Sequence, residues 1–492
     1  MDKLVRRYEH EGLEKAGSSL SDRARLLGYR DRLERVALAP LARTGKGFYL
    51  VVAVLGAIVL WGLYAYSRQL SGGLAVTGMG NPDAKSKVVW GFYIINFVFF
   101  IGISHAGTLI SAILRVTNAR WRMPVTRMAE FITVVALIVG ASAVIIDMGR
   151  PDRVLNMILY GRLQSPLIWD FLAISTYLTG SIIYLFVPLL PDLAMVRDRL
   201  GNRLSGPRRA LYRIISVNWQ GLPHQWRKLG FALTIMMIVI IPVAVSVHTV
   251  VSWIFAMTLR PGWNSTVFGP YFVAGAIFSG TATLIIMMVI LRKVYHLEEF
   301  LTKRHFINLG YILAAFCIIM LYFNLQETLV PAYKMAEEEP RWFYDVMGGR
   351  YSFWYWSYIF GGMVVPALLI LIPRTRNVAG IVVASILVVI AMWLERYLIV
   401  VGTLTIPQTP YEQVSYSPTW VEWSIMAGLF ALFSLIVAVF TKLVPVVSVW
   451  EMVEQHEEAV VHAPAQAVSG DGHAPTAARQ RSVVTAAERI SR

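Results

Sequence analysis

The sequence predicts an all-α polytopic membrane protein with ten transmembrane helices, and three observations support this prediction. Of the 492 residues, 56% are apolar and only 15% are charged, whereas soluble domains average about 45–50% apolar and about 25% charged. Ten apolar runs are long enough to cross a bilayer as helices. Lysine and arginine gather in alternate connecting segments, as they do when those segments stay on the inner side of a membrane.

The ten apolar runs follow one another through most of the chain. A spanning helix needs about 20 mostly apolar residues, and each run reaches about that length. The runs are too long for the strands of a membrane barrel, and they do not alternate apolar with polar positions. Their expected bounds are 47–67, 89–114, 128–147, 167–187, 229–256, 270–291, 306–325, 353–373, 378–400 and 421–443.

The distribution of basic residues predicts the orientation. If both termini are cytoplasmic, 34 of the 45 lysine and arginine residues fall in inner segments and 10 in outer loops. This bias is the one that the positive-inside rule describes. The net charge of +15 therefore predicts contact with a lipid bilayer and needs no nucleic-acid partner.

The two ends differ from the membrane domain, which we place at residues 46–445. Residues 1–45 alternate apolar and charged positions, which predicts a cytoplasmic amphipathic arm. Residues 446–492 form a cytoplasmic tail that is rich in Ala, Ser, Gly and His toward its end, and we expect it to be largely disordered.

Spans 2 and 6 end in similar phrases, which indicates an internal repeat. The second ends Thr108-Leu-Ile-Ser-Ala-Ile-Leu-Arg115 and the sixth ends Thr283-Leu-Ile-Ile-Met-Met-Val-Ile-Leu-Arg292. A shift of four spans preserves the direction of each helix, so the repeat would be parallel. We expect two four-helix bundles, spans 2–5 and 6–9, with spans 1 and 10 at the periphery.

Several titratable residues lie inside the expected spans, where a charge costs about 2.5–3.5 kcal/mol on insertion scales and usually faces a protein interior or a cavity. Arg150 follows Asp147 by one turn and could pair with it, and His105 is expected to lie deeper than His248. The candidate catalytic residues are His105, Asp147, Asp170 and His248, and the candidate ligand-binding residues are Arg150, Tyr177, Trp253, Glu395 and Arg396.

These residues also have purely structural interpretations. The two aspartates could be ordinary helix ends, Glu395 and Arg396 could form a structural ion pair, and the two histidines could be packing residues. If they act together, imidazoles and carboxylates beside Trp and Tyr suit a quinonoid ligand, because they can accept the two protons that a quinol releases on oxidation.

A quinol's electrons would have to leave through a partner protein. The one cysteine, Cys317, excludes a four-thiolate iron–sulfur or zinc site built from this chain alone. A haem between His105 and His248 would require the two side chains to meet at one depth. We therefore expect no metal site, haem or iron–sulfur cluster in this chain.

Two other classes of function remain open. Ten spans with a repeat also suit a secondary transporter, but Pro242 in span 5 and Pro366 in span 8 do not occupy corresponding places in the two halves, as interrupted transporter helices do. The chain could also be a structural membrane subunit without a working quinone site.

The polar stretches of spans 2–6 resemble the NrfD/PsrC family of membrane quinone-binding subunits, and among these the ActC and ActF subunits of alternative complex III. Ten spans and the chain length are most similar to ActC. The resemblance covers roughly residues 45–445. It rests on Trp90-Gly-Phe-Tyr-Ile-Ile-Asn-Phe97, Ser104-His-Ala-Gly-Thr108, Ile146-Asp-Met-Gly-Arg-Pro-Asp152, Ser165-Pro-Leu-Ile-Trp-Asp-Phe171, Ser246-Val-His-Thr-Val-Val-Ser-Trp253 and the run from Pro261 to Ser279.

The resemblance implies a specific role in a bacterial cytoplasmic (inner) membrane. Such a protein binds menaquinol near the periplasmic side and passes electrons to an iron–sulfur subunit on that face, then to a multihaem cytochrome c subunit. A homologous ActF-like membrane subunit would be a further partner, and protons would be released or translocated. In one departure, Ile254 stands where the family often has an acidic residue, which leaves any transmembrane proton route open.

Overall fold

The computed structural model describes residues 20–42, 44–79, 88–117, 119–201, 204–334, 339–406 and 414–461, and in these ranges the protein is helical without strands. Ten helices within them are long and apolar enough to cross a membrane. The prediction of an all-α polytopic membrane protein is therefore confirmed, and every expected span coincides with one of these helices.

The ten spanning helices have the following bounds. They are α3 (Lys46–Gly72, continued by η1, Gly73–Val76), α4 (Phe92–Val116), α5 (Met123–Asp147), α7 (Pro166–Leu200), α9 (Pro223–Ala256), α10 (Phe268–Val294), α11 (Lys303–Lys334), α13 with η5 and α14 (Ser352–Trp356, Ser357–Val364 and Val365–Leu371), α15 with η6 (Val378–Tyr397 and Leu398–Gly402), and α16 (Trp420–Phe440). Shorter helices are α2 (Leu20–Ala42), α6 (Asn156–Leu159), α8 (Gly206–Ile215), α12 (Glu339–Met347) and α17 (Val449–Val461).

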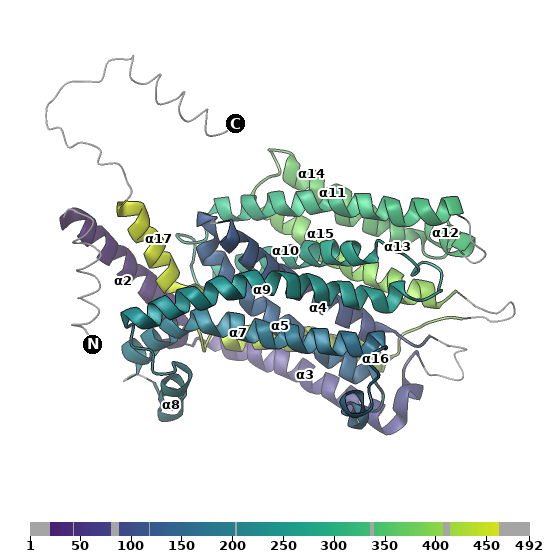
Figure 1. The fold of residues 1–492 in the computed structure, drawn as a ribbon, viewed down its shortest axis with the longest axis horizontal. Coiled ribbons are helices and arrows are strands. Elements are labelled where there is room, and N and C mark those ends of the chain that lie inside the picture. The colour runs from purple at the N-terminus through teal and green to yellow at the C-terminus, as the bar shows by residue number, and fades with distance from the viewer. Residues whose placement is uncertain are drawn as a thin grey trace, which may run out of the picture. The chain divides into compact units, whose positions relative to one another are not determined.

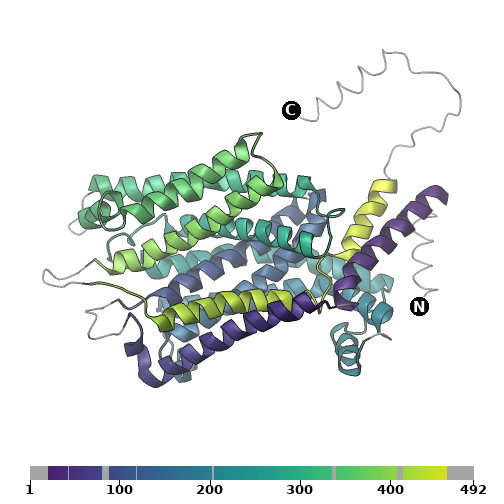
Figure 2. The ribbon, with the colours of Figure 1, turned by 180° about the vertical axis from the view of Figure 1, so that it is seen from behind.

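The helices form the two expected bundles. Helices α4, α5, α7 and α9 pack together as a first bundle, and α10, α11, α14 with η5, and α15 as a second. The two bundles meet where α4 packs along α10, while α3 and α16 pair with each other at the side (Figures 1 and 2). Burial agrees with this arrangement, because 94% of the apolar core of α4 is buried inside the protein and only 11% of that of α3.

Close contact between α4 and α5 depends on glycine. A Cβ atom on Gly107 would lie 2.0 Å from the carbonyl oxygen of Ala129, so only glycine fits. Small residues allow helix backbones to approach in this way within a membrane. The consequence is that the polar face of α4 is held directly against α5.

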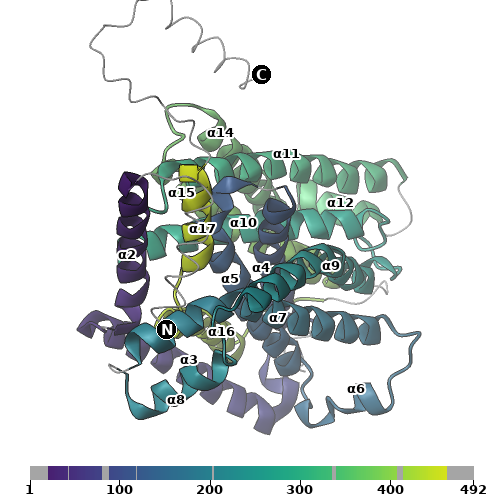
Figure 3. The ribbon, with the colours of Figure 1, turned by 60° about the vertical axis from the view of Figure 1, so that its left-hand side comes forward.

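The second bundle contains two π-helical segments, η5 and η6. Pro366 follows η5, and in a regular α-helix its ring would clash with the carbonyl of Gly362, so the wider turn relieves that clash. π-Helical turns occur mostly inside α-helices and are frequent at functional sites. Both segments lie toward the end of the bundle that carries α12, opposite the end that carries α8 (Figures 1 and 3).

The packed region extends beyond residue 445, the boundary expected from hydropathy. Val447 and Glu451 are 1% and 2% exposed, and α17 continues to Val461. On α2, Leu33 and Leu41 are buried while Leu27 is 51% exposed, so this helix has two unlike faces. The remainder of the expected arm, residues 1–19, and of the tail, residues 462–492, lies outside the described part of the chain.

Candidate functional site

Two histidines meet inside the first bundle. His105 on α4 and His248 on α9 are both wholly buried, and their ring centroids lie 4.3 Å apart. The expectation that His105 lies deeper than His248 is therefore wrong, because α4 and α9 cross so that the two side chains reach the same level. The rings are in direct contact, which leaves no space for a haem iron between them.

The two rings have different hydrogen bonds. Both nitrogens of His105 lie near carbonyl oxygens, Nδ1 at 2.8 Å from Ile101 and Nε2 at 2.7 Å from Ala244. A neutral imidazole donates through only one nitrogen, so His105 would donate to both carbonyls only after gaining a proton. His248 has no hydrogen-bond partner at either ring nitrogen among the described residues.

The unsatisfied ring of His248 requires an explanation. A buried polar group left without a partner costs about 1–3 kcal/mol, and such groups in native proteins commonly mark a water, an ion or a functional role. His248 is therefore a candidate functional residue at the contact of α4 and α9.

Tyr177 completes this cluster from α7. Its ring centroid lies 4.9 Å from that of His105, and its hydroxyl donates to the carbonyl oxygen of Ser104 at 3.2 Å. Asp170 lies seven residues earlier on the same helix, which corresponds to about 10 Å at 1.5 Å per residue. The cluster is therefore about two helical turns inward from Asp170.

Asp147 and Asp170 lie at the same end of the first bundle. Asp147 ends α5, and Asp170 lies near the start of α7 and is 7% exposed. Each has a buried carboxylate oxygen, Oδ1, without a hydrogen-bond partner among the described residues. Ordinary helix-end aspartates are solvated or capped, so these two differ from ordinary helix ends.

Arg150 does not pair with Asp147, so that prediction is wrong. Its guanidinium binds Asp152 at 2.9 Å, and both side chains are more than half exposed. This hydrogen-bonded pair lowers the pKa of Asp152 rather than that of Asp147. The reason is local: Gly149 has a positive φ of 65°, which ends the helix and turns the chain before Arg150.

Trp253 also lies away from the cluster. It is 42% exposed on α9, on a different face from His248. An exposed tryptophan near the end of a membrane helix is typical of the membrane–water interface, and this position suits that role better than contact with a buried ligand.

A column of polar side chains continues from the histidines toward the end of the bundle where α17 begins. Ser111 donates to Glu130 at 2.7 Å, and Arg115 donates to both Glu130 at 3.0 Å and Glu451 at 2.9 Å. These residues are spaced by three or four positions along α4, as one helix face requires. We call Ser104, Thr108, Ser111 and Arg115 with Thr133 and Glu130 the polar column.

Ion pairs close this column. Glu451 binds Arg115 and also Arg122, at 3.1 Å. Burial alone would raise the pKa of the Glu451 carboxyl, but Arg115, Arg122 and Arg127 together lower it below its usual value. Since an arginine side chain keeps its charge in a protein, Arg115 holds Glu130 and Glu451 in one buried ion-pair network at this end of the column.

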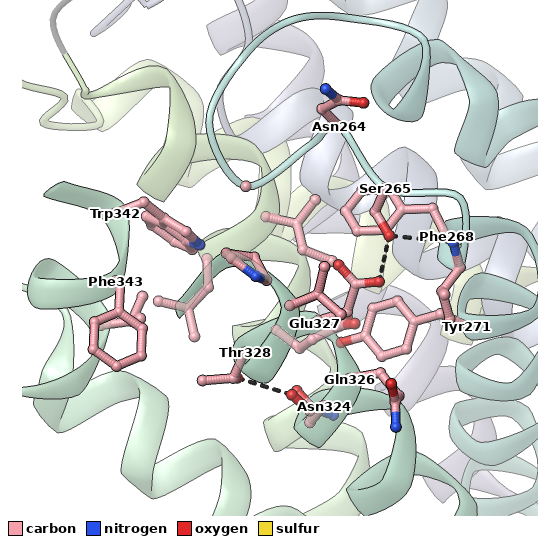
Figure 4. A pocket seen from close by; sticks show the side chains of 18 of the residues that line it. Asn264, Ser265, Phe268, Tyr271, Asn324, Gln326, Glu327, Thr328, Trp342 and Phe343 are labelled. Atoms are coloured by element: carbon pink, nitrogen blue, oxygen red, sulfur yellow. Dashed lines mark hydrogen bonds between the residues drawn. The ribbon is translucent and has the colours of Figure 1, made fainter. Parts of the chain in front are cut away.

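A cavity lies in the second bundle. Its volume is 280 Å³, and residues of α10, α11, α12, η5, α15 and η6 line it together with the loop before α10. Figure 4 shows Glu327, Tyr271, Asn324 and Trp342 around this space. Of the residues chosen from the sequence, Glu395 lines it, whereas His105, Asp147, Asp170 and His248 do not.

Glu395 and Arg396 are buried and hydrogen-bonded to each other. The Arg396 guanidinium lies where the two bundles meet, because a Cβ atom on Gly102 of α4 or Gly275 of α10 would come within 3.5 or 3.2 Å of its Nη2 atom. The pair therefore connects the wall of the cavity to the interface between the bundles.

Comparison with known proteins identifies the family. Residues 80–408 match the family described as polysulphide reductase, NrfD, and this range holds spans 2–9. The chain belongs to the NrfD family. The resemblance seen in the motifs around His105, Asp147, Asp170 and His248 is thereby confirmed.

Three relatives of this NrfD protein align over most of their own length. A selenate reductase subunit of Mesobacillus selenatarsenatis is 25% identical over 82% of this chain and 96% of the relative. The Hdr-like menaquinol oxidoreductase integral membrane subunit of Archaeoglobus fulgidus is 25% identical over 83% and 96%. The menaquinone reductase integral membrane subunit of Nitratidesulfovibrio vulgaris is 24% identical over 78% and 88%.

Sequence reasoning missed most of the cavity of this NrfD protein. Glu327 reads as a polar residue at a helix end, and Tyr271 and Tyr358 read as ordinary bundle aromatics. Trp342 comes from α12, a short helix between two spans. The available signal was the co-occurrence of Asn324 and Glu327 in one helix, because polar and acidic side chains are costly in a membrane span.

Proposed function

We propose that this chain is the menaquinol-oxidising membrane subunit of a quinol:electron-acceptor oxidoreductase of the alternative complex III type. The observation that carries the proposal is the unsatisfied His248 ring, wholly buried and 4.3 Å from His105. Two of the relatives are named for menaquinol or menaquinone chemistry, which supports the same ligand here.

The head group would lie between the His105–His248 pair and Asp170. These groups are separated by about two turns of α7, roughly 10 Å, so one quinol could present a hydroxyl to each end. His248 would accept a hydrogen bond from one hydroxyl, and Asp170 or Asp147 would accept the proton of the other. Tyr177 would pack against the ring, since aromatic rings favour offset or edge-on contacts.

Oxidation breaks both O–H bonds of the quinol. The two protons pass to His248 and to an aspartate, and the two electrons pass to an iron–sulfur subunit docked at the outer face and then to a multihaem cytochrome c. His105 lies beside His248 with a carbonyl oxygen near each ring nitrogen, those of Ile101 and Ala244, so these two contacts fix the orientation of its ring in the cluster.

The protons would leave outward, to the periplasm. Arg115 and its ion pairs with Glu130 and Glu451 close the polar column on the inner side of the histidines, and opening a buried pair costs about 3–5 kcal/mol. Asp147 and Asp170 lie at helix ends, which gives a shorter route to water. This orientation, with both termini cytoplasmic, also follows from the lysine and arginine distribution.

The test uses the purified assembly that contains this chain. His248→Phe keeps an aromatic ring and removes both nitrogens, and we expect quinol-dependent reduction of the acceptor to fall at least tenfold while the assembly stays intact. Trp253→Phe is the matched control, because Trp253 is exposed and should keep most of the activity. Full turnover in both His248→Phe and Asp170→Asn would refute the site.

A further inference from the structure

We propose that the cavity in the second bundle is a second ligand site, and that it binds a dihydroxylated aromatic ring, the reduced head group of a quinol. The site is separate from the one in the first bundle and rests on the cavity lining alone. Five features of that lining support it: size, aromatic walls, fixed geometry, hydrogen-bonding character and local backbone.

The size fits a head group. Sites for drug-sized ligands occupy about 300–1,000 Å³, and this cavity measures 280 Å³. A bicyclic ring is at the lower end of that range, whereas an intact lipid is much larger. An isoprenoid tail would therefore remain outside, in contact with the membrane.

The walls are aromatic and Trp342 is held in place. A Cβ atom on Gly262 would lie 2.8 Å from the indole Nε1 of Trp342, and one on Gly402 would lie 2.8 Å from its Cη2. Glycine at these two positions therefore lets the indole pack directly against the backbone of η6 and of the loop before α10. A flat wall fixed in this way suits the face of a planar ring.

Opposite Trp342, the cavity is lined by side chains that accept hydrogen bonds. Glu395 lines it with the Tyr271 and Tyr358 hydroxyls beside its carboxylate, and Glu327 lines it with its Oε1 accepting from Ser265 at 2.5 Å (Figure 4). Two carboxylates favour a ligand that donates hydrogen bonds, because bonds to ionised acceptors are the strong ones. A quinol has two O–H donors and a quinone has none.

The amide of Asn324, on the side of the cavity that carries Tyr358, is occupied by protein partners. Asn324 Nδ2 donates to Met320 and to the Tyr358 hydroxyl, both at 2.8 Å. An oxidised quinone, which needs donors at its carbonyl oxygens, would find this amide already engaged. A lipid phosphate is also disfavoured, since Glu327 would repel it, Arg396 is already paired with Glu395, and Lys334 is the one lysine among the lining residues.

The backbone around the cavity points to function as well. Tyr358 comes from the π-helical segment η5, and Leu398 and Ile399 come from η6. Such turns use less regular hydrogen bonding than an α-helix and are frequent at functional sites. Both π-helical segments therefore contribute lining residues to one cavity.

The experiment measures binding of two tailless probes to the purified, quinone-depleted assembly under anaerobic conditions. The probes are 1,4-dihydroxynaphthalene and 1,4-naphthoquinone. In a His248→Phe background, which removes the first-bundle ligand group, the reduced probe should still bind and the oxidised probe should bind at least tenfold more weakly. Equal affinity for the two probes would overturn the proposal.

Glu327→Gln then tests the cavity itself. We expect it to weaken binding of the reduced probe about tenfold and to leave the oxidised probe unaffected, with exposed Glu298→Gln as the matched control. Ser265→Ala is a milder variant that should weaken the reduced probe two- to fivefold. Unchanged binding in both Glu327→Gln and Ser265→Ala would place the probe elsewhere and refute the site.

Trp342→Phe locates the probe. The bound reduced probe should quench less tryptophan fluorescence in Trp342→Phe than in the natural protein. In Trp253→Phe the amount of fluorescence quenched by the probe should stay the same. Failure of this site and failure of the first are distinguishable, because the first is judged by turnover in His248→Phe and this one by binding in Glu327→Gln.

Discussion

Gly62 on α3 and Gly428 on α16 face each other so closely that a Cβ atom on Gly62 would lie 3.0 Å from the Cα atom of Gly428. Both helices are at the side of the molecule, and α16 also contacts the first bundle. In a membrane, small residues facing one another let helices pack at short distance, and this packing is a main source of their association. The Gly62–Gly428 contact therefore attaches span 1 to the rest of the protein.

Gly428→Leu should separate these two helices. Its side chain has no room against Gly62, and overpacking of this kind costs about 1–3 kcal/mol, so the midpoint of thermal unfolding in detergent should fall. Gly56→Leu is the matched control, because a Cβ atom at Gly56 on α3 meets nothing within 4 Å. Equal midpoints for both variants would show that the contact contributes nothing to stability.

Asp192→Asn should destabilise the end of the first bundle where α17 begins. Asp192 accepts from Arg127 at 2.5 Å and from the backbone N–H groups of Val449 and Trp450 at 3.3 Å, so the change leaves a buried arginine without its charge partner. Breaking a buried pair costs about 3–5 kcal/mol, and the segment before α17 should become accessible to protease.

The control for that change is Asp198→Asn. Asp198 pairs with Arg197 at 2.8 Å, but both side chains are partly exposed, and pairs of that kind contribute about 0–1 kcal/mol. If Asp192→Asn resists protease as well as Asp198→Asn does, the buried pair does not have the stabilising role proposed for it.

Glu451 predicts a dependence of stability on pH. Arg115, Arg122 and Arg127 outweigh the effect of burial and lower its pKa from the usual 4.5. A carboxyl with a lowered folded-state pKa contributes stability above its unfolded value, and that contribution is lost as the pH falls through the folded value. The unfolding midpoint of Glu451→Gln should therefore be lower than that of the natural protein at pH 7.

Acidification should narrow the difference in unfolding midpoint between the natural protein and Glu451→Gln. As the pH falls from the usual carboxyl value of 4.5 through the lowered folded-state value, the natural protein loses the Glu451 contribution, whereas Glu451→Gln has none to lose, so the two midpoints should converge. A gap of constant size between about pH 7 and about pH 3.5 would mean that Glu451 stabilises the fold by shape and not by charge.

The sequence allowed all ten spans to be located, because an apolar run of about 20 residues has few alternatives in a polytopic protein. It also indicated the two bundles and brought attention to His105 and His248. The sequence positions of His105 and His248 did not predict that their rings touch. The depth of each side chain in the membrane depends on the angle at which α4 and α9 cross. The cavity was hidden for a similar reason, since Trp342 reaches it from α12, outside every apolar run.

The turn that follows α5 could not be predicted from the sequence either. Arg150 stands one turn after Asp147 in a helical register, which predicts a pair. The left-handed backbone at Gly149, with a φ of 65°, breaks that register and directs Arg150 to Asp152. Glycine signals such a break, but a glycine within one turn of a helix end is equally compatible with a helix that continues.

The separation of Asp147 from Arg150 leads to the last prediction, Asp147→Asn. This variant keeps the shape of a side chain whose Oδ1 is buried without a partner among the described residues and removes its ability to take up a proton. If Asp147 relays a quinol proton, turnover should fall about tenfold or more, since a positioned acid or base contributes about 10²–10⁴-fold. Asp152→Asn is the matched control, because Asp152 is paired with Arg150 in solvent and should change turnover by less than twofold. If the two variants lose activity equally, the outer loop acts through its surface charge, and Asp147 has no separate role in proton release.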